Sequence, residues 1–283
     1  MDPSGKVVVV TGGSTGIGEA LARAFVNQHC KVVLSSRDPG RLEATRARVG
    51  SPERTLAITC DVRNREEIDR LLSLTLHNFG RVDIWINNAG YGLQDSVAAM
   101  DMAACRDMFH TNLFGTIECM QAVIPVMKRQ GGGMIINISS VAGHIPLPYM
   151  SAYSATKFAM NAVAKGAGME LRGSGIHVMT VCPGTVSTAF DVNSVKGKER
   201  LRLGPRRGIS AERVAAAVVN ACRTEKREVV VPWQHSISIK FYQLFPALVE
   251  AVMSRSLRPA DAAVPGTTPE ASRRPGTTGQ GSV

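Results

Sequence analysis

The sequence predicts a single α/β domain built on a doubly wound, mostly parallel sheet. Short runs rich in valine and isoleucine alternate with longer segments that carry apolar residues at helical spacing. Small and polar residues follow several of these runs directly, where the strands of such a sheet end and ligands bind. A hydrophobic content of 44% over 283 residues is ample for one large core. We therefore expect one domain over residues 1–257, with helices on both faces of a seven-stranded sheet.

The apolar runs are short and bounded by polar or small residues, as expected for strands buried on both faces. The expected strands span residues 6–10, 32–34, 56–59, 82–87, 134–136, 177–181 and 229–231.

The segments between these runs have helical periodicity, and several begin at a polar residue suited to capping a helix. The expected helices span residues 19–27, a segment ending near 49, a segment beginning near 64, then 103–129, 151–171 and 211–223.

The turn after the first strand carries glycines in a phosphate-binding pattern. TGGSTGIG spans residues 11–18, so that Gly12, Gly16 and Gly18 follow G-x-x-x-G-x-G. Such glycines allow a tight turn, and the next helix offers unpaired N–H groups to a pyrophosphate. The pattern alone also suits an ordinary glycine-rich turn. The flanking strand and helix, with a second strand at 32–34, favour nucleotide binding.

The stretch ISSVAGHIPLPYMSAYSATK, residues 138–157, carries a set of reactive side chains. Tyr153 and Lys157 are four residues apart on an expected helix, which places them one turn apart on one face. A cation beside a phenol favours the phenolate and lowers the phenol pKa. Ser140 follows the preceding strand and is placed to hold a substrate oxygen. Hydroxyl, phenol and ammonium together suit proton transfer to or from a carbonyl or alcohol.

With NNAG at residues 87–90, these motifs resemble the short-chain dehydrogenase/reductase family over about residues 5–232, in the family's order. The resemblance implies a Rossmann-type fold and hydride transfer with a nicotinamide cofactor. It implies catalytic roles for Ser140, Tyr153 and Lys157, and also for Asn112 within T-N-x-x-G. The alternative for Asn112 is a harmless polar position in a helix. The expected cofactor-binding residues are Gly12, Ser14, Thr15, Gly16, Ile17, Gly18, Ser36, Arg37, Asp61, Val62, Asn88, Ala89, Gly90, Tyr153, Lys157, Pro183, Gly184, Val186 and Thr188.

The end of the second strand favours NADP(H) over NAD(H). Ser36 stands where NAD-using relatives carry an aspartate, and Arg37 follows it. A guanidinium pairs with a 2′-phosphate, which a carboxylate would repel. Thr15 opposes this choice, because many NADP-using relatives carry a basic residue there. The alternative for Arg37 is a surface arginine paired with Asp38 or Glu43.

Two other functions could use the same residues. A serine hydrolase would use Ser140 with His144, but the G-x-S-x-G turn of such enzymes is absent from the sequence. A non-catalytic NADP-binding sensor or scaffold on the same fold stays open, because fold does not prove function. The substrate is expected to be apolar, such as a lipid, steroid, aromatic or acyl ketone. The residues expected to form its apolar wall are His144, Ile145, Pro146, Leu147, Pro148 and Met150.

Composition narrows the remaining possibilities. A net charge of +10 without a nucleic-acid-binding motif, and with 5% aromatic residues, does not favour nucleic acid. The six cysteines and six histidines are dispersed without metal-ligand spacing, so no metal is expected. A leader and a span of ~20 apolar residues are not seen, which makes the cytoplasm the expected location.

The last third of the chain is expected to hold variable segments. Residues 189–209 are expected to form a variable substrate loop. Residues 233–257, whose apolar residues recur at helical spacing, are expected to cover the substrate pocket rather than to touch a membrane. Residues 258–283 are rich in Pro, Gly, Ser, Thr and Arg, which predicts a disordered tail. From the family resemblance we expect a homodimer or homotetramer, formed through the helices that carry Asn112 and Tyr153.

Overall fold

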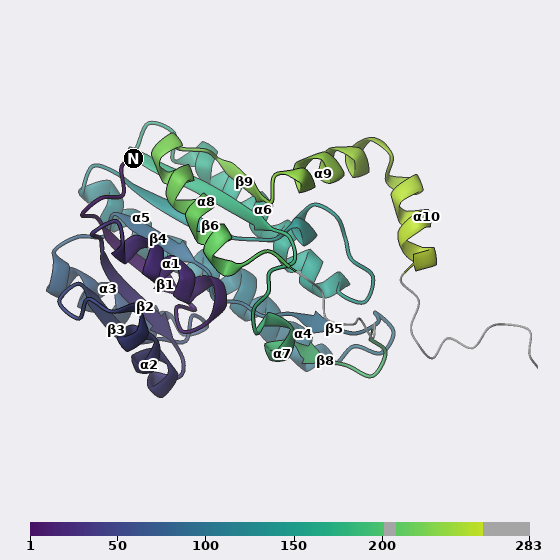
Figure 1. Cartoon of the computed structure of the whole chain (residues 1–283), viewed down its shortest axis with the longest axis horizontal. Helices are drawn as coiled ribbons and strands as arrows, with labels where there is room; N and C mark the ends of the chain where they lie inside the picture. The colour runs from purple at the N-terminus through teal and green to yellow at the C-terminus, as the bar shows by residue number, and fades with distance from the viewer. Residues whose placement is uncertain (201–207, 257–283) are drawn as a thin grey trace, which may run out of the picture.

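A computed structural model describes residues 1–200 and 208–256 (Figure 1). Seven parallel strands form one sheet, which confirms the predicted fold class. Each strand begins and ends within about two residues of its predicted run. The strands are β1 (Val7–Thr11), β2 (Lys31–Ser36), β3 (Thr55–Thr59), β4 (Ile84–Asn87), β6 (Gly133–Ile138), β7 (Ile176–Pro183) and β9 (Glu228–Val231).

The strand order is β3-β2-β1-β4-β6-β7-β9. Strands β2 and β3 are added on one side of β1, and the later strands are added on its other side. All five residues of β1 are buried, because helices cover both faces of the sheet. Val8 and Val10 belong to one apolar cluster, and Val9 belongs to the other. This alternation follows from the two-residue period of a strand.

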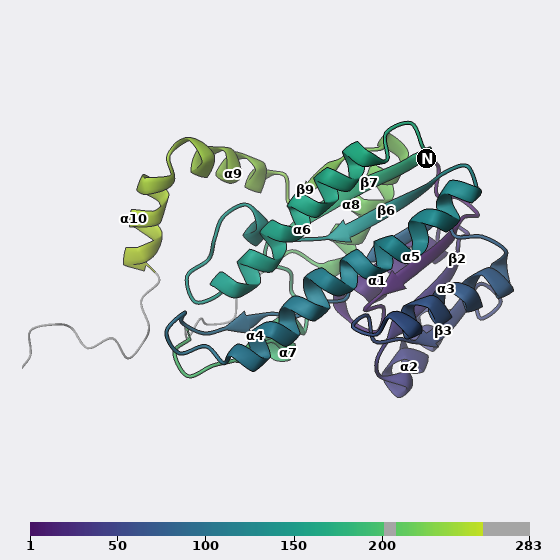
Figure 2. The same cartoon turned by 180° about the vertical axis from the view of Figure 1, so that it is seen from behind.

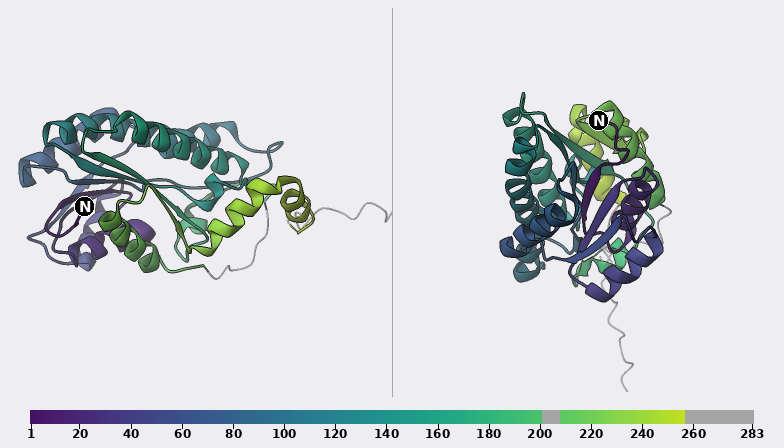
Figure 3. Two further views of the ribbon diagram at one scale, coloured as in Figure 1. Left: turned by 90° about the horizontal axis from the view of Figure 1, so that it is seen from above. Right: turned by 90° about the vertical axis from the view of Figure 1, so that its left-hand side faces the viewer.

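Two layers of helices enclose the sheet, as the edge-on views in Figure 3 show. On one face lie α1 (Gly16–Val26), α2 (Pro39–Val49) and α8 (Ala211–Thr224). On the other face lie α3 (Arg65–Phe79), α5 (Gly115–Arg129) and α6 (Ser151–Glu170).

The predicted helix over residues 103–129 is not one α-helix. It consists of α4 (Met102–Phe109), a π-helical turn over His110–Phe114, and α5. Side chains compete for the backbone groups of this turn, since the hydroxyl of Thr116 donates to the carbonyl of Asn112. π-Turns within helices often mark functional sites.

The segment 189–200 holds α7 (Phe190–Asn193) and β8 (Val195–Lys196), which pairs with β5 (Leu93–Gln94). The rest of the expected substrate loop includes residues 201–207, which lie outside the described residues. The predicted disordered tail, 258–283, also lies outside them.

The C-terminal helices extend away from the rest of the domain (Figures 1 and 2). The predicted single stripe is divided between α9 (Gln234–Leu244) and α10 (Pro246–Ser256), because a proline follows Phe245. α9 packs against β9, and α10 packs against α9. Ile239 is buried, whereas most large apolar side chains of both helices are exposed. These exposed residues are Trp233, Ile237, Phe241, Leu244, Phe245, Leu248 and Val252.

Candidate active site

The predicted site residues lie along one edge of the sheet. Because all seven strands are parallel, their carboxyl ends meet at that edge. Gly12 follows β1, Asp61 follows β3, Asn88 follows β4 and Ser140 follows β6. Pro183 is the last residue of β7. The fold therefore brings together segments that are far apart in the sequence.

The glycine turn packs its backbone closely against neighbouring backbone. Gly12 has a φ of 64°, and a Cβ there would lie 2.8 Å from the Cα of Ala89. A Cβ on Gly18 would lie 2.2 Å from the carbonyl oxygen of Gly12. Larger residues would not fit, and the N-terminus of α1 begins at Gly16. The turn and the helix N-terminus fit the pyrophosphate of a dinucleotide.

Asn88 joins the ends of β1 and β4. Its side-chain Nδ2 donates to the carbonyl oxygens of Thr11 and Gly12, both at 3.0 Å. The backbone N–H groups of Asn88 and Ala89 donate to the hydroxyl of Thr11 at 3.1 and 3.2 Å. These bonds fix the glycine turn against the NNAG motif.

Tyr153 and Lys157 lie side by side on α6. The Lys157 Nζ is 5.8 Å from the centroid of the Tyr153 ring and donates to the carbonyl of Ile138 at 2.9 Å. The hydroxyl of Ser140 accepts from the N–H of Ala142 at 3.1 Å, which caps a short 3₁₀ turn over Val141–Gly143. The end of β6 therefore lies next to the N-terminal part of α6, where Lys157 contacts Ile138.

Burial dominates the protonation of the pair. Tyr153 and Lys157 are both buried, and burial raises the pKa of Tyr153 to about 12. The hydroxyl of Ser140 acts in the opposite direction and lowers this pKa. Burial also lowers the pKa of Lys157 to about 8. The sequence argument that the ammonium lowers the phenol pKa is therefore outweighed here by desolvation.

Asn112 uses its carboxamide to hold the chain after the NNAG motif. Its Oδ1 accepts from the N–H of Tyr91 at 3.0 Å, and its Nδ2 donates to the Tyr91 carbonyl at 2.9 Å. Nδ2 also lies 3.2 Å from the hydroxyl of Thr156, which donates to the Tyr153 carbonyl at 2.7 Å. A Cβ on Gly90 would lie 2.9 Å from the Asn112 Oδ1 and 3.8 Å from the Lys157 Nζ. Asn112, Gly90 and Lys157 are therefore neighbours.

Charged residues that the sequence predicts to bind the adenosine end of a dinucleotide follow β2 and β3. Arg37 is exposed, and neither expected partner holds it: Asp38 pairs with Arg41, and Glu43 pairs with Arg46. Among the residues that the structure describes, no ion pair of Arg37 is seen.

Asp61 does not cap the next helix, because Asn64 accepts from the N–H groups of Glu66 and Glu67. The carboxylate of Asp61 is instead paired with Arg63, 2.5 Å away, and this pairing outweighs burial and lowers the Asp61 pKa. Val62 lies where α5 approaches β3, since a Cβ on Gly115 would lie 2.6 Å from the Val62 carbonyl oxygen.

The loop after β7 returns to the glycine turn. A Cβ on Gly16 would lie 3.2 Å from the Cβ of Thr188. Val186 bridges to Ile209, and the Ser140 hydroxyl donates to the Pro183 carbonyl at 3.4 Å. A Cβ on Gly184 would lie 2.4 Å from the Nε2 of His235, so the start of α9 borders this loop.

The remaining predicted cofactor residues lie on the same turn or strand end. The carbonyl of Ser14 accepts from Thr45 at 2.9 Å, Thr15 precedes α1, and Ile17 lies in the first turn of α1. Ser36 is the last residue of β2.

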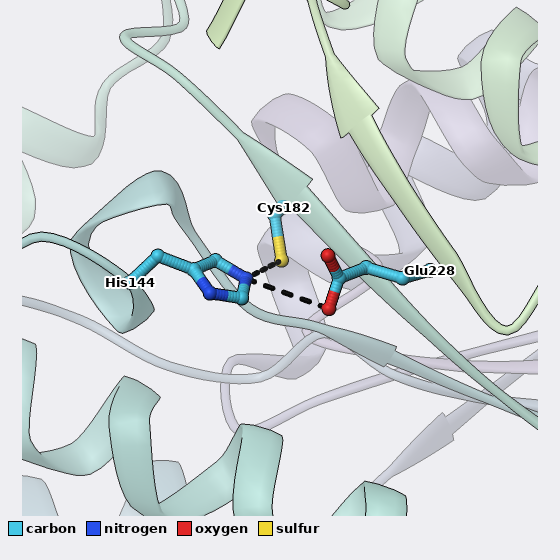
Figure 4. Close-up of side chains that lie close together, drawn as sticks. All are labelled: His144, Cys182 and Glu228. Atoms are coloured by element: carbon cyan, nitrogen blue, oxygen red, sulfur yellow. Dashed lines mark hydrogen bonds and ion pairs between the residues drawn. The ribbon is translucent and has the colours of Figure 1, made fainter. Parts of the chain in front are cut away.

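Apolar residues surround Tyr153. The Phe190 ring centroid lies 5.5 Å from that of Tyr153. Leu147 and Met150, two residues of the expected apolar wall, pack in the same cluster. His144 instead approaches Cys182 and Glu228 (Figure 4). No hydrogen bond joins His144 to Ser140 in the described part of the chain, so the arrangement does not support a serine hydrolase.

Several residues of the site were not identified from the sequence. Tyr91 follows NNAG directly, and Thr156 lies within the S-A-T-K run. Their positions next to these motifs are the sequence features that could have identified them. Arg63 binds Asp61 and also Asp107, which accepts from the Tyr91 hydroxyl at 2.8 Å. Asp107 lies on α4, far from Arg63 in the sequence. No local sequence pattern indicates that these residues meet.

The chain matches known proteins over most of its length. A family model described as short chain dehydrogenase matches residues 6–199. A ketoacyl reductase of Nostoc sp. is 34% identical over 231 residues, which cover 81% of this chain and 79% of that protein. A short-chain dehydrogenase of Streptomyces avermitilis has a solved structure with a TM-score of 0.79 and 30% identity, covering 89% and 97% of the two chains. A 3-ketoacyl-(acyl-carrier-protein) reductase from Brucella melitensis, solved with NADH, has a TM-score of 0.73 and 25% identity, covering 81% and 97%.

Proposed function

This chain belongs to the short-chain dehydrogenase/reductase family, and from that membership we propose that it moves hydride between a nicotinamide and a carbonyl or secondary alcohol. It is an NAD(P)-dependent oxidoreductase that acts on a small molecule. The observation that carries the proposed chemistry is the convergence of Asn112, Ser140, Tyr153 and Lys157 at the carboxyl edge of the sheet.

Each of the four residues has a proposed role. The nicotinamide, when bound, supplies or accepts the hydride. Tyr153 gives its phenolic proton to the carbonyl oxygen in reduction and takes it back in oxidation. Ser140 hydrogen-bonds the same oxygen, and Lys157 holds the nicotinamide ribose and favours the phenolate. Asn112 positions Tyr91 and lies beside Lys157, on the path by which a proton is replaced from water.

We propose NADP(H) as the preferred cofactor. Arg37 is exposed beside Ser36 and is not held by Asp38 or Glu43, which leaves its guanidinium available for a 2′-phosphate. A second basic group, Arg63, lies at the same edge but is bound to two carboxylates. The other proposed cofactor-binding residues are those predicted from the sequence.

We propose an apolar substrate, with an acyl ketone as the first class to test. The cluster around Tyr153 contains Leu93, Met108, Leu147, Met150 and Phe190, which offer a carbonyl compound an apolar surface. The ketoacyl reductase of Nostoc, at 34% identity, makes a ketoacyl group a reasonable starting point.

The deciding experiment is a substrate screen that follows cofactor absorbance with the purified full chain. A panel of acyl, aromatic and steroid ketones is offered with NADPH and with NADH. Turnover that disappears in Tyr153→Phe supports the proposed enzyme. Cofactor binding without turnover of any carbonyl would instead indicate the sensor or scaffold.

We also propose a homodimer or homotetramer formed through α5 and α6. Phe158 and Met169 on α6, and Phe114 directly before α5, are large apolar side chains that are exposed in the single chain. Light scattering is expected to show at least a dimer, and Phe158→Glu is expected to shift it toward the monomer. A monomeric wild-type protein at micromolar concentration would contradict this assembly.

The role of the C-terminal helices stays a prediction. The start of α9 borders the loop at Gly184, which supports a place beside the substrate site. In the parts of the chain that the structure describes, no helix is long and apolar enough to cross a membrane.

A further inference from the structure

Three side chains from separate segments point toward one another beside the sheet edge (Figure 4). His144 follows the 3₁₀ turn after β6, Cys182 lies near the end of β7, and Glu228 begins β9. The His144 Nε2 is 3.5 Å from the Cys182 Sγ and 3.5 Å from the Glu228 Oε2. All three ligand atoms lie within 4.8 Å of one another.

The two separations that involve His144 are compatible with a shared cation, and the Cys182 Sγ and the Glu228 carboxylate lie within 4.8 Å of each other. At 3.5 Å, the separation between His144 and Glu228 is long for an N–H···O bond. Zinc–sulfur and zinc–nitrogen bonds in a tetrahedral site give an S···N edge of about 3.6 Å, and zinc–oxygen bonds give an N···O edge of about 3.4 Å. Both observed separations agree with these edges.

The three residues of the cluster differ in how deeply their side chains are buried. Cys182 is fully buried and the His144 side chain is 8% exposed, whereas the Glu228 side chain is 33% exposed and has room to adjust. The amide oxygen of Asn161 is buried without a hydrogen-bond partner in the described residues, and Nδ2 of the same amide lies 3.4 Å from the His144 Nε2. The same Nδ2 donates to the Gly143 carbonyl at 2.9 Å, so Asn161 borders the cluster through its amide nitrogen.

Glu228, one of the three residues, lines a cavity on the surface of the protein. This cavity, of about 730 Å³ along the β7 side of the sheet, is also lined by Lys165 and Thr180, among others. Lys165 pairs with Glu228 at 3.6 Å, but its side chain is 62% exposed and free to swing into solvent. The cavity therefore borders the most exposed of the three candidate ligands.

We propose that His144, Cys182 and Glu228 form a zinc site. Thiolate, imidazole and carboxylate are the ligands that zinc prefers, and three of them leave a fourth position for water. On binding, the Cys182 thiol releases its proton to solvent and a sulfur–zinc bond forms, with no change in oxidation state. The site ties the segment after Ser140 to β7 and β9. Sequence spacing did not indicate it, because only the fold brings these strands and the loop together.

The test uses the full-length protein after dialysis against a chelator. Cobalt(II) is titrated as a spectroscopic substitute for zinc, followed by zinc competition and measurement of the melting temperature. Wild type is expected to bind one equivalent with a thiolate-to-cobalt charge-transfer band, to lose the band to zinc, and to melt at a higher temperature with zinc. Cys182→Ser is expected to lose the band. Cys222→Ser, which alters a buried cysteine on α8, is the matched control and is expected to keep it.

Glu228→Gln provides a second measurement that does not depend on the folding of the Cys182 variant. It is expected to weaken cobalt binding by at least tenfold, because a charged ligand becomes neutral. The proposal is overturned if wild type binds no cobalt at micromolar concentration, if Cys182→Ser keeps the band, or if Glu228→Gln binds as wild type does. These readouts do not involve turnover, so they are independent of the proposed reaction.

Discussion

Asn112 bonds both backbone groups of Tyr91, accepting from its N–H at 3.0 Å and donating to its carbonyl at 2.9 Å. The Asn112 side chain therefore satisfies the backbone hydrogen bonds of Tyr91, in the way that a neighbouring strand would in a sheet. Because the N–H and carbonyl are part-buried, loss of the carboxamide would leave them without these partners.

Asn112→Ala is expected to lower the free energy of unfolding by about 2 kcal/mol, the usual cost of orphaned buried polar groups. It is also expected to reduce turnover, since Gly90, which precedes Tyr91, lies beside Lys157. Urea denaturation and steady-state kinetics measure the two effects. Asn78→Ala, at an exposed position of α3, is the control and is expected to change stability by less than about 0.5 kcal/mol. Equal stability of the two variants would show that the Asn112 bonds contribute little.

Tyr153→Phe is expected to reduce turnover by at least about a hundredfold, because general acid–base catalysis contributes at least that factor. Its cofactor affinity is expected to stay close to that of wild type, since only the phenolic hydroxyl is removed. Tyr242→Phe, in which a partly exposed hydroxyl of α9 is lost, is expected to have wild-type turnover. Substantial activity in the Tyr153 variant would mean that another group supplies the proton.

Arg37→Ala is expected to raise the KM for NADPH by about ten- to a hundredfold, which corresponds to the loss of one or two charge-assisted hydrogen bonds. The KM for NADH is expected to change little, because NADH lacks the 2′-phosphate. Arg46→Ala removes an arginine of α2 that is paired with Glu43, and it serves as the control. Wild-type protein that uses both cofactors equally well would refute the NADP(H) preference.

Lys157→Met is expected to be more stable than wild type below pH 8, by about 1–2 kcal/mol, because the buried ammonium is removed. The pKa of Lys157 is about 8 in the folded state, below its ordinary value of 10.5, so its destabilising effect is complete below pH 8. Between pH 8 and 10.5 the unfolded state binds more protons, and the stability of wild type rises with pH. Tyr153, whose pKa is raised to about 12, opposes this rise above pH 10.

Chemical denaturation between pH 7 and 9.5 measures this linkage. Wild type and Lys128→Met, a change at an exposed lysine of α5, are expected to gain stability over this range from Lys157. The Lys157 variant is expected to lack that gain. The same gain in all three proteins would show that Lys157 is not the group responsible.

Leu248→Ser is expected to leave stability within about 0.5 kcal/mol of wild type, because Leu248 is exposed on α10. Ile239→Ser is expected to destabilise by about 2 kcal/mol, since Ile239 is the buried residue of α9. Urea denaturation distinguishes them. A large effect at Leu248 would indicate that its face is covered in solution.

Local patterns were sufficient to predict the sheet and most of its helices. The central strands β1, β4, β6 and β7 are short apolar runs that are buried on both faces, and that environment imposes the composition from which the runs were recognised. The glycine motif and the Tyr153–Lys157 pair are also local patterns. Each lies just after a predicted strand or on the helix that follows it, so the arrangement of the strands predicted where each would lie.

Features that depend on partners distant in sequence could not be predicted. The pKa of Tyr153 is decided by how much of the fold covers it, rather than by the lysine four residues away. The bonds of Asn112 to Tyr91 and of Arg63 to Asp107 depend on where α4 lies. The division of the C-terminal stripe between α9 and α10 is different, because it follows from Pro246, a local signal. The exposure of the stripe depends on the rest of the fold.

The π-turn over His110–Phe114 has a consequence for the residues on either side of it. A wider turn holds one more residue than an α-turn, so α4 is rotated about 100° relative to its place in an uninterrupted helix. Met108 therefore joins the cluster around Tyr153, whereas Cys119 packs against the sheet, although ideal α-helical spacing would put both on one face. Deleting one residue within 110–114 would return the two halves to a common phase and turn Met108 away from Tyr153. One additional residue in the π-turn thus allows α4 to pack in the cluster around Tyr153 while α5 packs against the sheet.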